Sequence, residues 1–412
     1  MRITQTPTVE DHWAFVETLG RPLPAVVWPL LAEPSSSEQG CLGAVLAESL
    51  TALFPVPPFT NSAMDGFALR HADIAGATAE QPVSLPVAGD IPAGDTEPHE
   101  LAPGTAWRIM TGAPVPAGAD TVVKVEQTNH APGTTEPPDC VEFHAAPAAG
   151  ANIRAVGEDV SVGSTVLLAG RVLDAMALAC AASTGHGRLR VHPRPRVGII
   201  TTGDELVDPG RQPRPGQIPD SNGVLLAGLV DPASLLATLR SWAAVDLVIT
   251  AGGISAGAYE VVRQALTGPT MCFHHVAQQP GGPQGAGTSL VGGRQVPVLC
   301  LPGNPVSVFV SFQLYVAGVI SVMAGRRHDG RPAEVDVVAS AAWRSPAEKT
   351  QFVPVSMTGA TTIAPIHRLV SGSHLVASLP LADGLVRVPV GVDHVRPGDP
   401  LRMIPTRPGG MA

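Results

Sequence analysis

Acidic and hydroxyl side chains follow the end of an apolar run near the middle of the chain. The mostly aliphatic residues 197–200 are followed within a few positions by Thr202, Gly203, Asp204 and Glu205. This pattern predicts a buried strand that opens onto a polar turn. Carboxylates at the end of a strand are placed to hold a divalent cation or to transfer protons.

A further acidic position, Asp220, follows along the chain beside Ser221 and Asn222. An Asp in a turn also has a simpler role, because its carboxylate can cap a helix by accepting bonds from the first backbone N–H groups. Capping is the more common role for a single turn Asp such as Asp204 or Asp220. The presence of several such acids in one region favours a functional site.

Glycine-rich turns follow two other apolar runs. Residues 247–251 lead into a turn at 252–257, and residues 297–301 lead into the turn Pro-Gly-Asn-Pro at 302–305. A third Gly-rich turn, at 278–283, lies between them. Such turns bring backbone N–H groups close to a phosphate or a similar oxyanion. Taken singly, each of them is more often only a tight connection.

The turn at 252–257 also allows a different interpretation. Gly253, Ser255 and Gly257 fit the G-x-S-x-G pattern that follows a strand in α/β-hydrolases. A serine hydrolase would need Ser255 exposed on a strained turn, a His within reach and an upstream loop of oxyanion donors. The sequence has no HGGG-type segment for that loop, and half of the chain would have no role, so this is the lesser alternative.

A single parallel sheet would bring these turns together. The apolar runs at 197–200, 247–251 and 297–301 each end in a polar or glycine-rich turn and precede a helix-like segment. The carboxyl ends of parallel strands meet at one edge of a sheet, and ligands bind there. We therefore expect an α/β domain over residues 193–328, with the site at that edge and a last helix at 306–323.

The rest of the chain predicts smaller domains around this one. Residues 9–19, which follow a possible cap at Thr8, favour a helix, as do residues 42–53 and 171–185. Short β-like runs predict a β domain inserted in the first half and an all-β C-terminal domain that includes a strand at 374–379. The expected domains are a helical, mixed N-terminal linker domain at 1–57 and 148–192, an inserted β domain at 58–147, the α/β domain at 193–328 and a β-barrel-like domain at 329–412.

Composition limits the class of protein. Hydrophobic residues make up 44% of the 412 residues, mean hydropathy is +0.20 and the net charge is −9, with only 26 Lys and Arg. Because a basic face is the usual footprint of nucleic-acid binding, this balance argues against such a partner. The 5 scattered cysteines, without a C-x-x-C pair, favour a reduced, cytoplasmic compartment. Neither a signal peptide nor a membrane span is predicted.

Polar turns also occur in the first half of the chain. Asp65 lies in a turn within residues 58–69, and Thr111 lies in another within residues 108–123. Both segments combine Asn, Ser, Asp, Thr and Gly with hydrophobic anchors, which is typical of displayed polar groups. Ordinary turn chemistry would also explain them.

An ordered set of motifs resembles the molybdopterin molybdenumtransferase family, the MoeA-like proteins. The motifs are NSAMDGFAL at 61–69, RIMTGAPVPAGADTVV at 108–123, GEDV at 157–160, TTGDEL at 201–206, PDSN at 219–222, AGGISAG at 251–257 and LPGNPVS at 301–307. They extend over nearly the whole chain. The segments QQPGGPQG and GAYE are most similar to actinobacterial members.

The resemblance implies a reaction and an assembly. The reaction is insertion of molybdate into adenylylated molybdopterin, a small anionic pterin nucleotide, to give molybdenum cofactor with release of AMP, assisted by Mg²⁺. The assembly is a homodimer whose active cleft lies between the α/β domain of one subunit and the inserted β domain of the other. Other molybdenum cofactor biosynthesis proteins and apo-molybdoenzymes are further implied partners. A noncatalytic molybdopterin-binding scaffold that delivers the cofactor stays open as an alternative.

The resemblance also implies roles for individual residues. Those implied for catalysis are Asp65, Thr111, Asp159, Asp204, Glu205 and Asp220. Glu205 and Asp220 are the expected ligands of Mg²⁺, and Asp65 and Thr111 would face them across the dimer interface. The residues implied for binding the pterin nucleotide are Thr202, Gly203, Ser221, Asn222, Gly252, Gly253, Ser255, Gly257, Pro280, Gly281, Pro302, Gly303, Asn304, Pro305 and Ser307.

The chain departs from the family at positions that affect the charge of the site. Many members carry lysines where this chain has Gln279 and Gly282, and an Asp where it has Ala258. An Arg is often expected where this chain has Pro354. The missing lysines are the feature that keeps the scaffold alternative open.

The segment after Val230 is shorter than expected. The helix that begins near Ser221 reaches Val230 and is followed at once by Asp231 and Pro232, where another helix, at 233–242, is expected to start. A wound sheet places a strand between successive helices, and the resemblance implies a further strand and loop at this point. Either residues are absent from the sequence between Val230 and Asp231, or the protein has lost a strand there. We expect the first, because loss of a central strand would expose apolar sheet surface and cost more than the ~5 to 15 kcal/mol that holds a domain folded.

Overall fold

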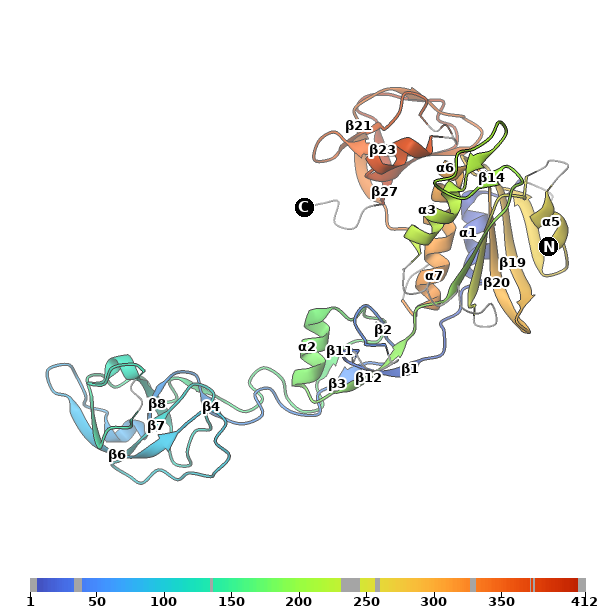
Figure 1. The fold of residues 1–412 in the computed structure, drawn as a ribbon. Helices are drawn as coiled ribbons and strands as arrows, with labels where there is room; N and C mark the ends of the chain where they lie inside the picture. The colour runs from blue at the N-terminus through green and yellow to red at the C-terminus, as the bar shows by residue number, and fades with distance from the viewer. Residues whose placement is uncertain are drawn as a thin grey trace. The chain divides into compact units, whose positions relative to one another are not determined.

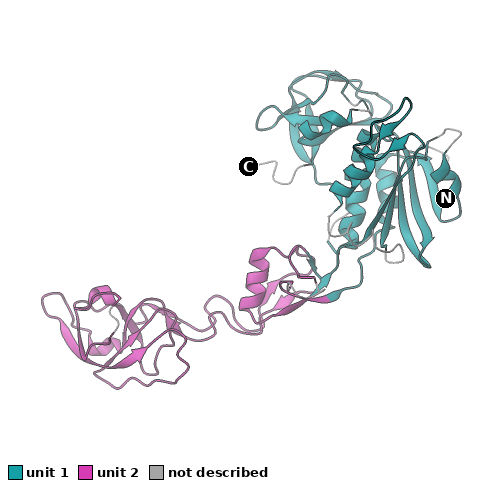
Figure 2. Cartoon of the chain, in the orientation of Figure 1, with its two compact units in different colours: residues 1–26, 44–47, 190–412 teal, residues 27–43, 48–189 magenta. Residues whose placement is uncertain are grey.

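The structure is a computed structural model that describes residues 6–32, 39–133, 136–230, 245–255, 260–326, 331–370, 372 and 375–406. The chain forms two compact units, shown in Figure 2. Unit 1 consists of Met1–Val26, Ala44–Ala47 and Arg190–Ala412, and unit 2 consists of Val27–Gly43 and Glu48–Leu189. The finer division into domains at residues 57, 147, 192 and 328 stays a prediction.

Unit 1 contains a five-stranded sheet in the order β13-β16-β20-β19-β17 (Figure 1). Its strands are β13 (Val197–Thr201), β16 (Leu247–Ala251), β20 (Arg294–Leu301), β19 (Pro283–Val291) and β17 (Met271–His275). The first three are parallel, and the last two are added antiparallel. Thr201 pairs with Ala251, and Ala251 pairs with Leu301, so the three parallel strands end side by side as the sequence predicts.

Helices cover both faces of this sheet, which gives three layers (Figure 1). They are α1 (Val9–Glu17), α3 (Ser221–Leu229), α5 (Val261–Leu266), α6 (Pro305–Ser311) and α7 (Ala317–Met323). Leu247 and Ile249 pack in a core with residues of α1, α3, α6 and α7, whereas Val248 between them packs with Val262 of α5. This alternation follows from the two-residue period of a strand.

A single long helix runs beneath the site. A π-helical turn at Phe312–Val316 joins α6 to α7, and the combined helix Pro305–Met323 is 67% buried. It is the one helix among the described residues that is long and apolar enough to cross a membrane, and its burial is that of a core helix. Asn304 and Pro305 start it directly after β20, which places its N-terminus at the carboxyl edge of the sheet.

The C-terminal part of unit 1 is a closed barrel. Strands β23, β24, β21, β27 and β25 pair in sequence, and β25 pairs back with β23. Their bounds are β21 (Val335–Ala339), β23 (Thr350–Met357), β24 (Thr362–Pro365), β25 (Gly384–Val388) and β27 (Pro400–Pro405). This confirms the β-barrel-like domain. A short strand of the α/β part, β18 (Gln278–Gln279), adds to β23 from outside the ring. The remaining short strands of unit 1 are β2 (Val45–Leu46), β14 (Leu206–Val207), β15 (Ile218–Pro219), β22 (Trp343–Arg344) and β26 (His394–Val395), and β12 (Arg188–His192) begins in unit 2 and ends in unit 1.

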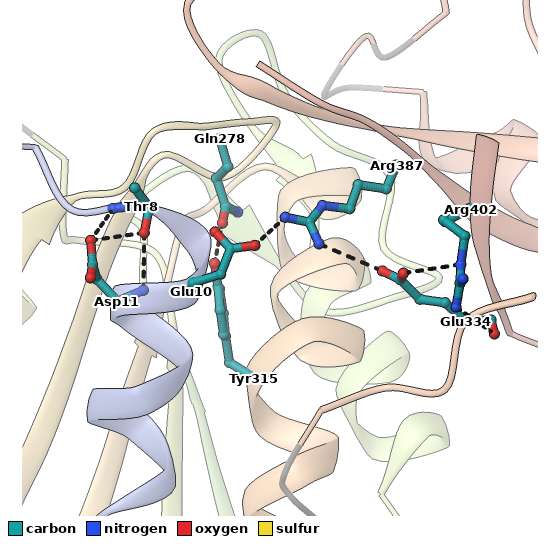
Figure 3. A network of polar contacts seen from close by, with 8 residues as sticks. All are labelled: Thr8, Glu10, Asp11, Gln278, Tyr315, Glu334, Arg387 and Arg402. Atoms are coloured by element: carbon teal, nitrogen blue, oxygen red, sulfur yellow. Dashed lines mark hydrogen bonds and ion pairs between the residues drawn. The ribbon is translucent and has the colours of Figure 1, made fainter. Parts of the chain in front are cut away.

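Helix α1 connects the α/β part to the barrel. Thr8 and Asp11 form the expected capping box at its start, and Trp13 donates from Nε1 to the carbonyl oxygen of Leu314 at 2.6 Å. On its outer face Glu10 forms an ion pair with Arg387 of the barrel (Figure 3). The predicted domains group this helix with residues 27–57, whereas its apolar side packs in the core of unit 1.

Unit 2 consists mainly of a five-stranded sheet in the order β8-β5-β7-β6-β9. Its elements are β4 (Asn61–Ser62), β5 (Gly66–Leu69), β6 (Val83–Ile91), β7 (Ala106–Ile109), β8 (Thr121–Lys124), β9 (Cys140–Phe143), β10 (Ile153–Arg154) and the 3-10 turns His71–Asp73 and Val125–Gln127. The remaining elements are β1 (Val26–Pro29), β3 (Leu50–Thr51), β11 (Thr165–Leu167) and α2 (Ala175–Ser183). The predicted helix at 171–185 is therefore confirmed as α2.

Two predicted elements were wrong. Residues 42–53 form the short strands β2 and β3 with turns between them, because buried Leu50 and Ala52 alternate with exposed Thr51 and Leu53, a period of two rather than 3.6. Of the predicted strand at 374–379, residues 376–379 belong instead to a 3-10 helix, Val376–Leu381, that contains Pro380, and His374 lies outside the described residues. The φ of proline, fixed at about −65°, is compatible with a 3-10 conformation.

The expected gap after Val230 falls on residues that the structure does not describe, since Asp231 and the predicted helix at 233–242 lie outside the described residues. In the described sheet β13 pairs directly with β16, with Val197 opposite Leu247. The described sheet therefore has no place for a further strand between β13 and β16.

Candidate functional site

A cleft of about 1090 Å³ opens where β13, β16 and β20 end. The polar and glycine-rich turns predicted from the sequence line this cleft together. The predicted residues that line it are Thr202, Gly203, Asp204, Glu205, Ser221, Asn222, Gly252, Gly253, Ser255, Pro280, Gly281, Pro302, Gly303, Asn304, Pro305 and Ser307. Gly257, which was also predicted to bind, lies outside the described residues.

The glycines of the cleft are required by the backbone. Gly252 has φ +98° and Gly281 has φ +85°, both in the left-handed region that disfavours side chains. A Cβ on Gly252 would lie 2.6 Å from the carbonyl oxygen of Thr202, so the turns after β13 and β16 are in direct contact. The backbone amide of Gly252 also donates to the carbonyl oxygen of Leu301 at 3.1 Å, and this bond holds the turn against the end of β20.

Asp220 lies at the side of the cleft rather than within it. Its carboxylate caps α3 by accepting from the amide of Gly223 at 3.0 Å, and it accepts from the hydroxyl of Thr201 at 2.6 Å. Its neighbour Ser221 lines the cleft, whereas Asp220 lines an adjoining, mostly apolar pocket of about 550 Å³ between α3 and the 3-10 helix Val376–Leu381. Asp220 therefore caps α3, as the simpler interpretation of a turn Asp predicted. A metal ion would have to bind the lone pairs of its carboxylate oxygens that these two hydrogen bonds leave unused.

Glu260 is a cleft residue that sequence reasoning missed. Its carboxylate accepts from the backbone amide of Ser255 at 2.9 Å and from the hydroxyl of Ser255 at 2.5 Å. Gln264 and Gly372 also line the cleft without having been predicted. The sequence signal for Glu260 was its position shortly after the glycine-rich turn at 252–257. Gly372 comes from the C-terminal part of the chain, and no motif marked it as a cleft residue.

This arrangement does not match a serine hydrolase. The hydroxyl of Ser255 donates to a carboxylate, whereas a nucleophilic serine needs a histidine base in hydrogen-bond reach. None of the described residues that line the cleft is a histidine. Nothing in the site favours the hydrolase alternative.

The cleft is lined by carboxylates but by no cationic side chain. Among the described lining residues there is no Lys, Arg or His, whereas Asp204, Glu205 and Glu260 are present. Hydrogen-bond donors come from the backbone turns and from the start of α6. Asn222 holds two walls together, because its side-chain amide donates to the carbonyl oxygen of Gly303 at 2.7 Å. An anion bound here must rely on backbone N–H groups and on added cations.

Unit 2 carries a separate polar cluster. The backbone amide and the hydroxyl of Thr111 both donate to Oδ1 of Asp65 at 2.7 Å, and these bonds lower the pKa of Asp65. Both residues are exposed, so the second carboxylate oxygen of Asp65 is presented to solvent. Asp159 is also exposed, in a turn that is fixed by the bond from its amide to the carbonyl oxygen of Val56 at 2.9 Å. Asp65 and Thr111 therefore form a hydrogen-bonded pair, and their expected place opposite Glu205 and Asp220 stays a prediction.

Comparison with known proteins identifies the family. Three family models match the chain in order: the MoeA N-terminal region (domain I and II) over residues 8–185, a probable molybdopterin binding domain over 198–321 and the MoeA C-terminal region (domain IV) over 336–406. The chain belongs to the MoeA family.

Similar proteins agree with this assignment. A Mycobacterium tuberculosis protein named molybdopterin molybdenumtransferase 2 is 38% identical over 96% of this chain and 98% of its own length. A Nostoc protein named molybdopterin molybdenumtransferase is 33% identical over 86% of this chain and 85% of its own. The crystal structure of the molybdopterin biosynthesis MoeA protein from Pyrococcus horikoshii is 27% identical, covers 98% of this chain and 100% of its own, and superposes with a TM-score of 0.77. These likenesses confirm the multidomain MoeA architecture.

The departures from other MoeA proteins have structural settings. Gln279 lines the cleft, and Gly282 is covered by His275, because a Cβ at position 282 would lie 2.4 Å from Nε2 of that imidazole. Pro354 pairs with Leu385 inside the barrel and is not a cleft residue. Ala258 lies outside the described residues. The alignment with the Mycobacterium relative runs over 420 residues, more than the 412 of this chain, so that relative has residues without a counterpart here.

Proposed function

We propose that this chain is a molybdopterin molybdenumtransferase, which inserts molybdate into adenylylated molybdopterin and releases AMP. The observation that carries the proposal is the cleft itself, where three glycine-rich turns and one helix start converge at the carboxyl edge of the sheet. Both substrates are oxyanions, and this combination of backbone donors suits phosphate and molybdate groups. Relatives with the matching name extend over nearly the whole chain.

Each part of the cleft has a role in this reaction. The turns at 252–253 and 302–304 and the N-terminus of α6 would hold the phosphates of the pterin nucleotide by their N–H groups. The acids Asp204 and Glu205 line the same cleft in the turn that follows β13. Because two acids would repel an anionic substrate, their presence in a binding cleft implies a counter-ion.

Magnesium is the cation that these residues fit. Glu205 in the cleft and Asp220 at its side carry carboxylate oxygens, which are the ligands that Mg²⁺ prefers. No cluster of three or more His, Cys, Asp or Glu that could hold a metal ion occurs among the described residues. Mg²⁺ commonly binds one or two carboxylates together with substrate phosphates and water, so two acids suffice. Once bound, it would neutralise charge on the phosphate and molybdate oxygens.

We further propose that the protein works as a homodimer in the cytoplasm. Unit 2 exposes large apolar side chains of the kind that subunit contacts cover: Met176 is 73% exposed, Leu168 68% and Phe54 57%. Asp65 and Thr111 would then serve the cleft of the other subunit. All of the cysteines are free, which suits a reducing compartment. Sedimentation as a monomer at micromolar concentration would contradict the assembly.

The activity is tested by reconstituting a cofactor-free molybdoenzyme. Purified protein supplied with adenylylated molybdopterin, molybdate and Mg²⁺ should restore enzyme activity well above a control without the protein. Glu205→Gln should reduce the yield by at least about tenfold, which corresponds to about 1.4 kcal/mol of transition-state stabilisation. A yield equal to that of the control would favour the noncatalytic scaffold that binds and delivers cofactor.

A further inference from the structure

Two buried glutamines lie beneath the turn that carries Pro280 and Gly281. Gln278 is 1% exposed and Gln284 is 2% exposed, although both carry a polar carboxamide. They flank the turn along the chain, Gln278 as the first residue of β18 and Gln284 near the start of β19. The core around them contains the large apolar side chains Phe352, Val276 and Val310.

Both glutamines donate to carbonyl oxygens of the turn. Nε2 of Gln278 donates to the oxygen of Pro280 at 3.0 Å, and Nε2 of Gln284 donates to the oxygen of Gly281 at 2.7 Å. Their side chains are themselves held from the long helix. Tyr315 donates its hydroxyl to Oε1 of Gln278 (Figure 3), and Nε2 of Gln284 also donates to the hydroxyl of Ser311 at 2.7 Å.

These bonds determine which way the turn's amides point. In a trans peptide the C=O and the N–H lie on opposite sides of the chain. Because the oxygens of Pro280 and Gly281 face the buried glutamines, the N–H groups of Gly281 and Gly282 face away from them. Neither N–H has a hydrogen-bond partner among the described residues. Gly281 lines the cleft, so its N–H is free to meet a ligand there.

A role in core packing alone does not explain why two carboxamides are buried here. Burying an amide in an apolar core is unfavourable unless it is hydrogen-bonded, and an apolar residue of the same volume could fill the space. The glutamines instead connect the turn rigidly to the long helix. Recognition of a small oxyanion requires hydrogen-bond donors, here the backbone N–H groups of the turn, that are held in fixed positions.

We propose that Gln278 and Gln284 are positioning residues that aim the backbone N–H groups of this turn at an oxyanion of the substrate. The oxyanion is tetrahedral, either molybdate or a phosphate of the nucleotide. The turn would thereby supply, through its backbone, the anion contact that no cationic side chain of the described cleft supplies. The proposal rests on the proposed function, because it assigns the turn to that substrate.

The test uses Gln278→Met and Gln284→Met, which preserve volume and remove the donor. Binding of molybdate and of AMP to each purified variant is measured separately by calorimetry. The probe whose oxyanion lies on the turn should bind about tenfold more weakly, since one charge-assisted hydrogen bond is lost. In cofactor formation KM should rise for the substrate whose oxyanion lies on the turn, molybdate or the pterin nucleotide, while kcat stays within about twofold. Weaker molybdate binding assigns the turn to molybdate, and weaker AMP binding assigns it to the nucleotide phosphate.

Two further variants separate positioning from stability. Tyr315→Phe removes only the hydroxyl that holds Gln278, and it should weaken the same probe by a smaller factor. Val319 lies in the same helix and core but lines no part of the cleft, so Val319→Ala should lower the melting temperature without changing either affinity. An equal loss of affinity in Val319→Ala would overturn the proposal.

The remaining outcomes keep this proposal distinct from the proposed function. If the wild-type protein forms cofactor and both probes bind equally to it and to both Gln→Met variants, the positioning role is wrong and the function stands. If the wild-type protein binds neither probe and forms no cofactor, both are wrong.

Discussion

The role of Asp220 can be separated from helix capping by a matched pair of positions. Asp220 caps α3 by accepting from Gly223 at 3.0 Å, and Asp174 caps α2 of unit 2 in the same way by accepting from Ala177 at 2.7 Å. Asn is as good an N-cap as Asp, whereas Ala loses the cap and destabilises by about 1 kcal/mol. Asp220→Asn and Asp174→Asn should therefore leave stability within about 0.5 kcal/mol of wild type. Both Ala variants should lower it, and Asp220→Ala by more, because the hydroxyl of Thr201 also loses its acceptor.

Cofactor formation should respond at only one of the two positions. If Asp220 helps to hold Mg²⁺, Asp220→Asn should lower the yield at least about tenfold, or about 1.4 kcal/mol, and shift the Mg²⁺ dependence to higher concentration. Asp174→Asn should retain wild-type yield, because Asp174 has no part in the cleft. Denaturant unfolding and the reconstitution assay are run on all four variants. Wild-type yield and Mg²⁺ dependence in Asp220→Asn would show that this residue only caps α3.

Further predictions concern the assembly, a buried histidine and the hydrolase alternative. Inactive Asp65→Ala subunits mixed with inactive Glu205→Gln subunits should recover partial activity, because one of the two clefts in a mixed dimer carries neither lesion; no recovery despite proven subunit exchange would count against a shared site. His12 has its pKa lowered from 6.5 to about 3, by burial and then by the charge of His274. Since the unfolded chain takes up this proton near pH 6.5 and the folded chain only near pH 3, stability should fall as pH drops through that window, by up to about 1.4 kcal/mol per pH unit. His12→Gln should show a correspondingly shallower loss in denaturant unfolding between pH 7 and pH 5, and an unchanged slope would refute the assignment. A fluorophosphonate probe should leave Ser255 unlabelled, and covalent labelling would revive the hydrolase hypothesis.

The cleft was predictable because its signals are local in sequence. An aliphatic run that ends in a glycine-rich turn marks the carboxyl end of a buried strand, and β13, β16 and β20 each carry that mark. One general rule about parallel strands then brings the turns together. The register Thr201, Ala251, Leu301 shows how closely the strand ends coincide.

The features that were missed depend on tertiary contacts. Residues 42–53 have enough Ala and Leu to suggest a helix. In the structure Leu50 and Ala52 are buried and the residues that follow each of them are exposed, a strand pattern that composition does not reveal. Gly372 reaches the cleft from a segment distant in sequence, without a motif of its own. The partners of Gln278 and Gln284 lie on the long helix far along the chain, so only the structure shows that these glutamines hold the turn.

The central claim is that the cleft transfers molybdate to adenylylated molybdopterin, and simultaneous measurement of both products tests it most directly. Purified protein is incubated with adenylylated molybdopterin, with molybdate and Mg²⁺ added together or singly, and AMP and pterin-bound molybdenum are quantified. The account predicts that one AMP appears for each molybdenum incorporated, only when molybdate and Mg²⁺ are both present, and that Glu205→Gln loses both products together. Bound pterin nucleotide without release of AMP when molybdate and Mg²⁺ are both present would contradict it.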